Sequence, residues 1–107
     1  DTYNNMAVKG PDFKKAFVDR VPVSNADVAI TLAEILNLKI PHQGKLIGRV
    51  LHESLAKGAK KVSFKSQTLT SQPATNGLKT ILKYQTVGST RYFDVAGFPG
   101  RTLGLTK

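Results

Sequence analysis

Apolar side chains recur at helical spacing between residues 26 and 37. Ser24 or Asn25, just before this segment, can cap a helix, and Asp27 places a negative charge in the first turn, where the helix dipole favours it. Asn37 is typical of the C-terminal end of a helix. The pattern therefore predicts a helix at about 26–37 that packs through one apolar face, composed of Val28, Leu32, Ile35 and Leu36.

A second apolar stripe follows between residues 45 and 56, and Gly58 lies just beyond it as a candidate C-cap. This stripe predicts a second helix at about 45–56. Nearer the N-terminus, residues 6–9 form a short run that Gly10 and Pro11 interrupt, which favours a short buried strand. The members of the second stripe are Leu46, Ile47, Val50, Leu51 and Leu55.

The remainder of the chain favours β-structure. Residues 61–65 alternate between polar and apolar as a short strand does, and residues 67–77 have the composition of an exposed loop. Residues 78–87 and 91–95 are predicted strands, which residues 88–90 connect into an antiparallel hairpin. The fold class expected for residues 1–107 is therefore α/β or α+β, with a short N-terminal strand, two packed helices and a C-terminal hairpin.

The net charge of +9 is unevenly distributed over the 107 residues. Residues 1–44 hold five basic and five acidic residues, whereas residues 45–107 hold eleven basic and two acidic ones. Such an excess favours an anionic partner, which could be nucleic acid, an anionic membrane, a phosphorylated substrate or an acidic protein surface. Seven residues are the candidate anion-binding set: Lys57, Lys60, Lys61, Lys65, Lys79, Lys83 and Arg91.

These basic residues have a second interpretation. Strand alternation places Lys79 and Lys83 on one face, where lysines could simply solvate a sheet edge and discourage aggregation. Single-stranded nucleic acid is usually bound through stacking aromatics, and this chain has few of them. Nucleic acid is therefore not the favoured partner.

Residue types that carry catalysis or bind metals are sparse. The absence of Cys excludes a thiolate nucleophile, a disulfide framework and Cys-ligated zinc. His42 and His52 are not at the i, i+4 spacing of a helical zinc pair, and residues 97–102 lack the Gly-Lys-Ser/Thr ending of a phosphate-binding loop. No apolar run approaches the roughly 20 residues of a membrane span. The residues alone therefore predict no catalytic, cofactor-binding or metal-binding position.

Several short segments, in a fixed order, are similar to those of a known family. Met6–Lys14 resembles a strand followed by a Gly-Pro turn. Asn25–Thr31 and Ile35–Leu38 resemble a helix of the pattern Asp, apolar, any, Pro, Thr with a Leu-Leu-Gly ending, except that Ile30 replaces the Pro and Asn37 the Gly. Further matching segments are Gly44–Leu46, Gly48–Leu51, Asn76–Leu78, Arg91–Asp94 and Phe98–Thr102. In this order they resemble the C-terminal part of alkaline-phosphatase-superfamily catalytic domains, which include sulfatases and type I phosphodiesterase/nucleotide pyrophosphatases.

This resemblance implies that the chain is the C-terminal fragment of a larger catalytic domain with an α/β sheet enzyme fold. The parent would be a metal-dependent phosphoesterase, and its Thr or Ser nucleophile and its Asp and His ligands for two divalent metals, usually zinc, are expected before Asp1. The segment would then be inactive alone, and its partner would be the remainder of the parent catalytic domain. The resemblance would also allow a periplasmic or secreted location.

Two other functions stay open from the sequence. One is an independent small basic α+β module that binds nucleic acid or another polyanion through residues 57–91. The other is an assembly domain that associates with itself through exposed apolar surface.

Overall fold

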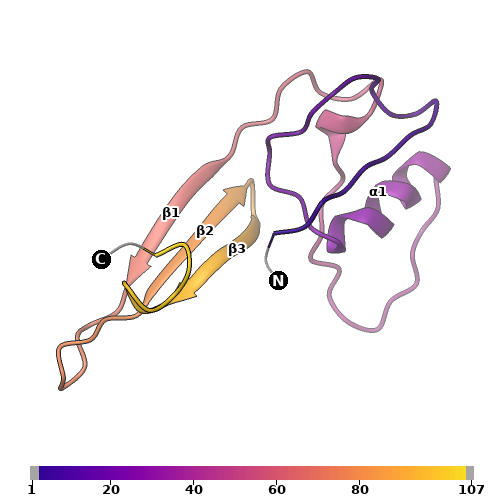
Figure 1. The fold of residues 1–107 in the computed structure, drawn as a ribbon. Coiled ribbons are helices and arrows are strands. Elements are labelled where there is room, and N and C mark those ends of the chain that lie inside the picture. Colours follow the sequence, from indigo (N-terminus) through magenta and orange to yellow (C-terminus); the bar gives the residue numbers. More distant parts are fainter. Residues whose placement is uncertain (1–2, 106–107) are drawn as a thin grey trace. The chain divides into compact units, whose positions relative to one another are not determined.

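The computed structural model describes residues 3–105, which form two compact units (Figure 1). The helical unit is Met6–Ser63. The sheet unit consists of residues 3–5 together with residues 64–105. Each unit has its own secondary structure.

Helix α1, Ala26–Leu36, is the one α-helix among the described residues. The backbone N–H of Ser24 donates to Asp27 Oδ2 at 2.8 Å, while Ser24 Oγ accepts from the N–H of Ala26 at 3.2 Å, so the N-terminal groups are satisfied reciprocally. At the other end Asn37 is the C-cap, consistent with the predicted stop, and it adopts a left-handed conformation with φ of 52°.

The face that α1 buries differs from the predicted one. The buried residues of the helix are Asp27 and Thr31, both polar. Leu32 is 45% exposed and Leu36 is 63% exposed, and Val28 is exposed as well. Among the described residues the apolar stripe is therefore largely exposed, with Ile35 half-buried, because the polar side chains of Asp27 and Thr31 take the inner positions.

The predicted second helix at about 45–56 is wrong, since this segment contains only a 3₁₀ turn, η1, His52–Ser54. Two of its backbone N–H groups are bonded to side chains of α1: Arg49 N–H donates to Asp27 Oδ1 at 2.8 Å, and Leu51 N–H donates to Thr31 Oγ1 at 3.1 Å. These tertiary bonds take the donors that a helix would use internally, and they outweigh the local apolar pattern.

The predicted N-terminal strand at residues 6–9 is also wrong. Met6 and Val8 are exposed, and the described part of the helical unit contains no strand with which they could pair. The extended contact that this unit does make is a single antiparallel bridge between Phe13 and Leu55. The bonds Lys14 N–H to Ser54 O, at 2.9 Å, and Ala56 N–H to Asp12 O, at 2.8 Å, flank it.

The sheet unit contains a three-stranded antiparallel sheet in the order β1-β2-β3 (Figure 1). Its strands are β1, Lys65–Thr70, β2, Ile81–Val87, and β3, Thr90–Gly97. Gly88, with φ of 57°, lies in the short turn between Val87 and Thr90, which form a pair. Strand β1 occupies residues predicted in part as a loop, because its six side chains are all exposed and most are polar, so no apolar alternation marks it.

The described residues thus form a small α+β protein with one α-helix and a three-stranded antiparallel sheet, and the predicted architecture of an N-terminal strand, two packed helices and a hairpin is wrong. The apolar core is small. Leu51 is the buried apolar residue of the helical unit, and the sheet unit buries Tyr84, Val87, Tyr92 and Leu105. With α1 at 11 residues, no helix in residues 3–105 has the length and apolar character to cross a membrane.

Candidate functional site

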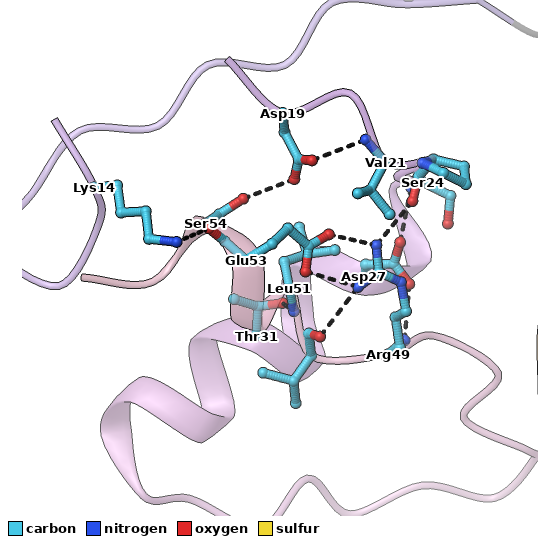
Figure 2. A network of polar contacts seen from close by, with 12 residues as sticks. Lys14, Asp19, Val21, Ser24, Asp27, Thr31, Arg49, Leu51, Glu53 and Ser54 are labelled. Atoms are coloured by element: carbon cyan, nitrogen blue, oxygen red, sulfur yellow. Dashed lines mark hydrogen bonds and ion pairs between the residues drawn. The ribbon is translucent and has the colours of Figure 1, made fainter. Parts of the chain in front are cut away.

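A network of polar contacts centred on Arg49 holds the helical unit together (Figure 2). The Arg49 guanidinium donates two hydrogen bonds to the Glu53 carboxylate, Nη1 to Oε2 at 2.9 Å and Nη2 to Oε1 at 2.6 Å. Nη2 also donates to the carbonyl oxygen of Pro22 at 2.9 Å. The side chains are 12% and 2% exposed, so this is a buried bidentate ion pair rather than a surface one.

Asp27 and Thr31 attach α1 to the same segment. Asp27 is fully buried, and its two carboxylate oxygens accept from the backbone N–H groups of Ser24 and Arg49, each at 2.8 Å. Thr31, one turn later on the same face, accepts from Leu51. Residues 49–51 are therefore fixed to the helix through hydrogen bonds that include their own backbone.

The network continues through Asp19 and Lys14 (Figure 2). Asp19 accepts from Ser54 Oγ at 2.9 Å and from the N–H of Val21 at 3.0 Å. Lys14 Nζ donates to the carbonyl oxygens of Glu53, at 2.6 Å, and Ala59, at 2.9 Å. These hydrogen bonds join the irregular segment before α1 to η1.

Electrostatics keeps the Glu53 carboxylate ionised. Burial alone raises the pKa of Glu53, but the hydrogen bonds and the positive charge of Arg49 outweigh burial, so the pKa of Glu53 lies below its ordinary value. Within residues 3–105 every buried side-chain nitrogen and oxygen has a hydrogen-bond partner. The buried polar groups of the network therefore satisfy one another's hydrogen bonds and charges.

This closed arrangement does not fit a divalent metal. The carboxylate of Glu53 is taken by a guanidinium and that of Asp27 by two N–H groups, whereas a metal needs free oxygens. Across the described residues no three side chains of His, Asp or Glu gather as metal ligands would. The hydrogen bonds of the network can orient and stabilise the helical unit.

The two histidines lie outside the network. His42 is exposed in the loop after α1, with Nδ1 3.1 Å from the carbonyl oxygen of Ile40. His52 is exposed at the start of η1.

The candidate anion-binding residues divide between the two units. Lys57, Lys60 and Lys61 belong to the helical unit, and the other four belong to the sheet unit. Lys79 precedes β2, so strand alternation does not apply to Lys79 as predicted. Lys83 Nζ lies 3.4 Å from the carbonyl oxygen of Gly104.

Two of the basic residues share a sheet face with aromatic rings. Lys65 and Arg91 both pair with Thr86, which places them on the face that also carries Tyr84. The Arg91 guanidinium lies 5.6 Å from the centre of the Tyr84 ring, within cation–π range. The Tyr84 ring in turn contacts Phe93, which is largely exposed, at a centroid distance of 6.2 Å.

Sequence interpretation assigned Asp27 to the first turn of the helix but missed Thr31, Arg49 and Glu53. A usable signal existed, because Glu53 is one of only two acids after residue 44 and follows Arg49 by four residues. An isolated acid near an Arg within an apolar stripe is a candidate buried ion pair.

No family model, curated protein or solved structure matches the chain.

Proposed function

We propose that the chain is a C-terminal structural segment of a metal-dependent phosphoesterase and is inactive alone. The observation that carries the proposal is the joining of two segments that resemble the alkaline phosphatase superfamily. Asp27 and Thr31 in the first segment accept hydrogen bonds from Arg49 and Leu51 in the second. Residues that are needed for one shared structural contact are expected to occur together in one family's sequence pattern.

Two details of the helical unit support the same proposal. Asn37 stands where the family has Gly, and its φ of 52° is a conformation that glycine adopts most readily. Gly48 begins the second segment, and a Cβ at this position would overlap the carbonyl oxygen of Ala26. Residue 37 thus has a conformational reason to be Gly or Asn, and residue 48 has a steric reason to be Gly.

The proposal assigns the chemistry to the rest of the parent protein. In two-metal phosphoesterases the ions activate the nucleophile and stabilise the charge that develops on the phosphoryl oxygens. The resemblance implies that these ions are zinc. The carboxylates of Asp27 and Glu53 are occupied by hydrogen bonds and do not fit such ions. The role of this segment is to supply a rigid structural element to the parent.

Hydrolysis assays test the proposal. The parent protein that contains residues 1–107 should hydrolyse a model phosphodiester or phosphomonoester in the presence of titrated zinc or manganese, whereas the purified 107-residue chain should not. His42→Ala and His52→Ala variants of the chain serve as controls. Metal-dependent turnover by the chain itself, lost in either variant, would show that a complete active site lies within it.

Polyanion binding is a second candidate function, and the sheet face with Lys65 and Arg91 favours it. The exposed ring of Phe93 and the Arg91–Tyr84 pair give this face both positive charge and aromatic surface. Proteins that bind single-stranded nucleic acids combine these two features. Salt dependence of binding is the test.

A further inference from the structure

Two pairs of adjacent basic residues occur in the chain, Lys14–Lys15 and Lys60–Lys61. Some endoproteases have two acidic pockets that bind successive cationic side chains, and they cleave the peptide bond that follows such a pair. Accessibility decides which pair such a protease can use, because the substrate segment must be exposed and must adopt an extended conformation in order to bind. The two pairs differ sharply in this respect.

Lys60 and Lys61 lie in an exposed segment that lacks hydrogen bonds to the rest of the described chain. Both side chains are exposed, and residues 61–64 have no regular secondary structure. Within residues 3–105 no hydrogen bond or ion pair involves residues 60–63. Ser63 is the last residue of the helical unit, and β1 begins at Lys65. Exposed connections at the boundary of a compact unit are where proteolytic cleavage concentrates.

Lys14 and Lys15, in contrast, are held by the helical unit. The N–H of Lys14 donates to Ser54 O at 2.9 Å, and its Nζ donates to the carbonyl oxygen of Glu53 at 2.6 Å. The peptide bond after this pair leads into Ala16, which has a left-handed φ of 50° instead of an extended conformation. A protease would have to break these hydrogen bonds and rotate the backbone of Ala16 before it could bind this pair.

A cut after Lys61 would leave the main contacts of both units in place. Helix α1 and the Arg49–Glu53 network precede the cut, and all three strands follow it. The reaction consumes one water molecule: the carbonyl carbon of Lys61 gains the water oxygen and becomes a carboxylate, while its bond to the nitrogen of Val62 breaks and that nitrogen becomes a new terminal amine. No other reactant is needed.

We propose that Lys60–Lys61 is a processing site, at which an endoprotease specific for paired basic residues cleaves the Lys61–Val62 bond. The product chains are residues 1–61, which contain the helical unit almost entirely, and residues 62–107, which contain the three strands. This inference is independent of both candidate functions above, because it depends only on the exposure and hydrogen bonding of the two basic pairs.

The experiment follows digestion of the folded 107-residue chain by an endoprotease that cleaves after paired basic residues. Intact-mass spectrometry and N-terminal sequencing identify the fragments. Cleavage at Lys61–Val62 should be at least about tenfold faster than at Lys15–Ala16, since cleavage follows the population of the accessible form. Digestion should stop at residues 1–61 and 62–107. Synthetic peptides of residues 10–19 and 56–65 should be cut at similar rates, because neither has a folded unit around it.

Lys61→Gln and Lys15→Gln form a matched pair of variants, because each removes the charge of an exposed second lysine. Lys61→Gln should abolish the cut and keep the wild-type urea midpoint, since Lys61 makes no hydrogen bond within residues 3–105. Lys15→Gln should leave the rate of cleavage at Lys61–Val62 unchanged.

Several results would overturn the inference. A folded chain that resists the protease, or that is cut first at Lys15–Ala16, contradicts it. A second cut at Lys15–Ala16 soon after the first contradicts it too, because the helical unit would then be degraded and not released. Unchanged cleavage of Lys61→Gln would exclude recognition of the basic pair. Resistance of the peptide of residues 10–19 would show that sequence, and not structure, distinguishes the two pairs.

Discussion

Arg49 is the residue on which the helical unit depends most. It bonds Glu53 twice and Pro22 once through its side chain, and Asp27 through its backbone. A buried ion pair adds little stability compared with an apolar pair of the same shape, but removal of one partner leaves the other charge buried and uncompensated. A single replacement at either position is therefore far more damaging than a joint replacement of both.

Arg49→Met should destabilise the folded chain by about 3–5 kcal/mol at neutral pH, because it leaves the Glu53 carboxylate buried without its cation. The pKa of Glu53 is lowered in the folded protein, so the stabilisation is present above the ordinary pKa of a glutamate and is lost as the pH falls through the lower folded value. Urea unfolding over a pH series should therefore show the difference between wild type and variant shrinking on acidification. Arg101→Met, in an exposed turn, is the control and should change little. A constant difference at all pH values would contradict the role given to Glu53.

Among the elements, α1 was predictable and the segment after it was not. The helix has both terminal signals and a regular apolar spacing, so residues 26–37 define it locally. Residues 45–56 have the same spacing, but the bonds of Arg49 and Leu51 to α1 are tertiary and leave no periodic trace in the sequence. The face that α1 buries was missed for the same reason: the bonds from Arg49 to Asp27 and from Leu51 to Thr31 join residues at least 20 positions apart.

The approach of residues 48–51 to α1 can be tested at Gly48. Gly48→Ala should destabilise the chain by about 1–3 kcal/mol, because the added Cβ would overlap the backbone of Ala26 and force the two segments apart. Gly44→Ala is the matched control, since a Cβ there meets nothing within 4 Å. Urea denaturation midpoints measure both. Equal midpoints for the two variants would mean that residue 48 does not lie close to the helix.

At the scale of the whole molecule, both units carry positively charged candidate residues. Three of the seven candidate residues belong to the helical unit and four to the sheet unit, and within the sheet Lys65 and Arg91 lie on the face opposite Lys83. The concentration of positive charge after residue 44 could be predicted from the sequence. Which sheet face each basic residue occupies depends on strand register, which composition does not determine.

Polyanion binding should therefore be weak in specificity and should fall with salt. A Lys57, Lys60 and Lys61 triple Ser variant should weaken binding to a single-stranded oligonucleotide and flatten the plot of log affinity against log salt, by up to about 0.7 for each phosphate that the variant no longer neutralises. A Lys65 and Arg91 double Ser variant compares the sheet face directly. Fluorescence anisotropy at several salt concentrations measures both. Unchanged, sequence-selective binding by the triple variant would instead favour a dedicated nucleic-acid module centred elsewhere.

Strand β1 joins its sheet through backbone pairing with β2, while all six of its side chains remain exposed. Its contribution to the fold consequently depends little on side-chain identity, provided that each residue can adopt an extended conformation and no proline removes a ladder donor. Residues 65–70 should accordingly accumulate neutral substitutions during evolution far faster than residues 49–53, where Arg49 and Glu53 can change only together. Related sequences would show this as a variable stretch beside a nearly constant one, and the contrast would mark which parts of the chain selection maintains by shape and which by chemistry.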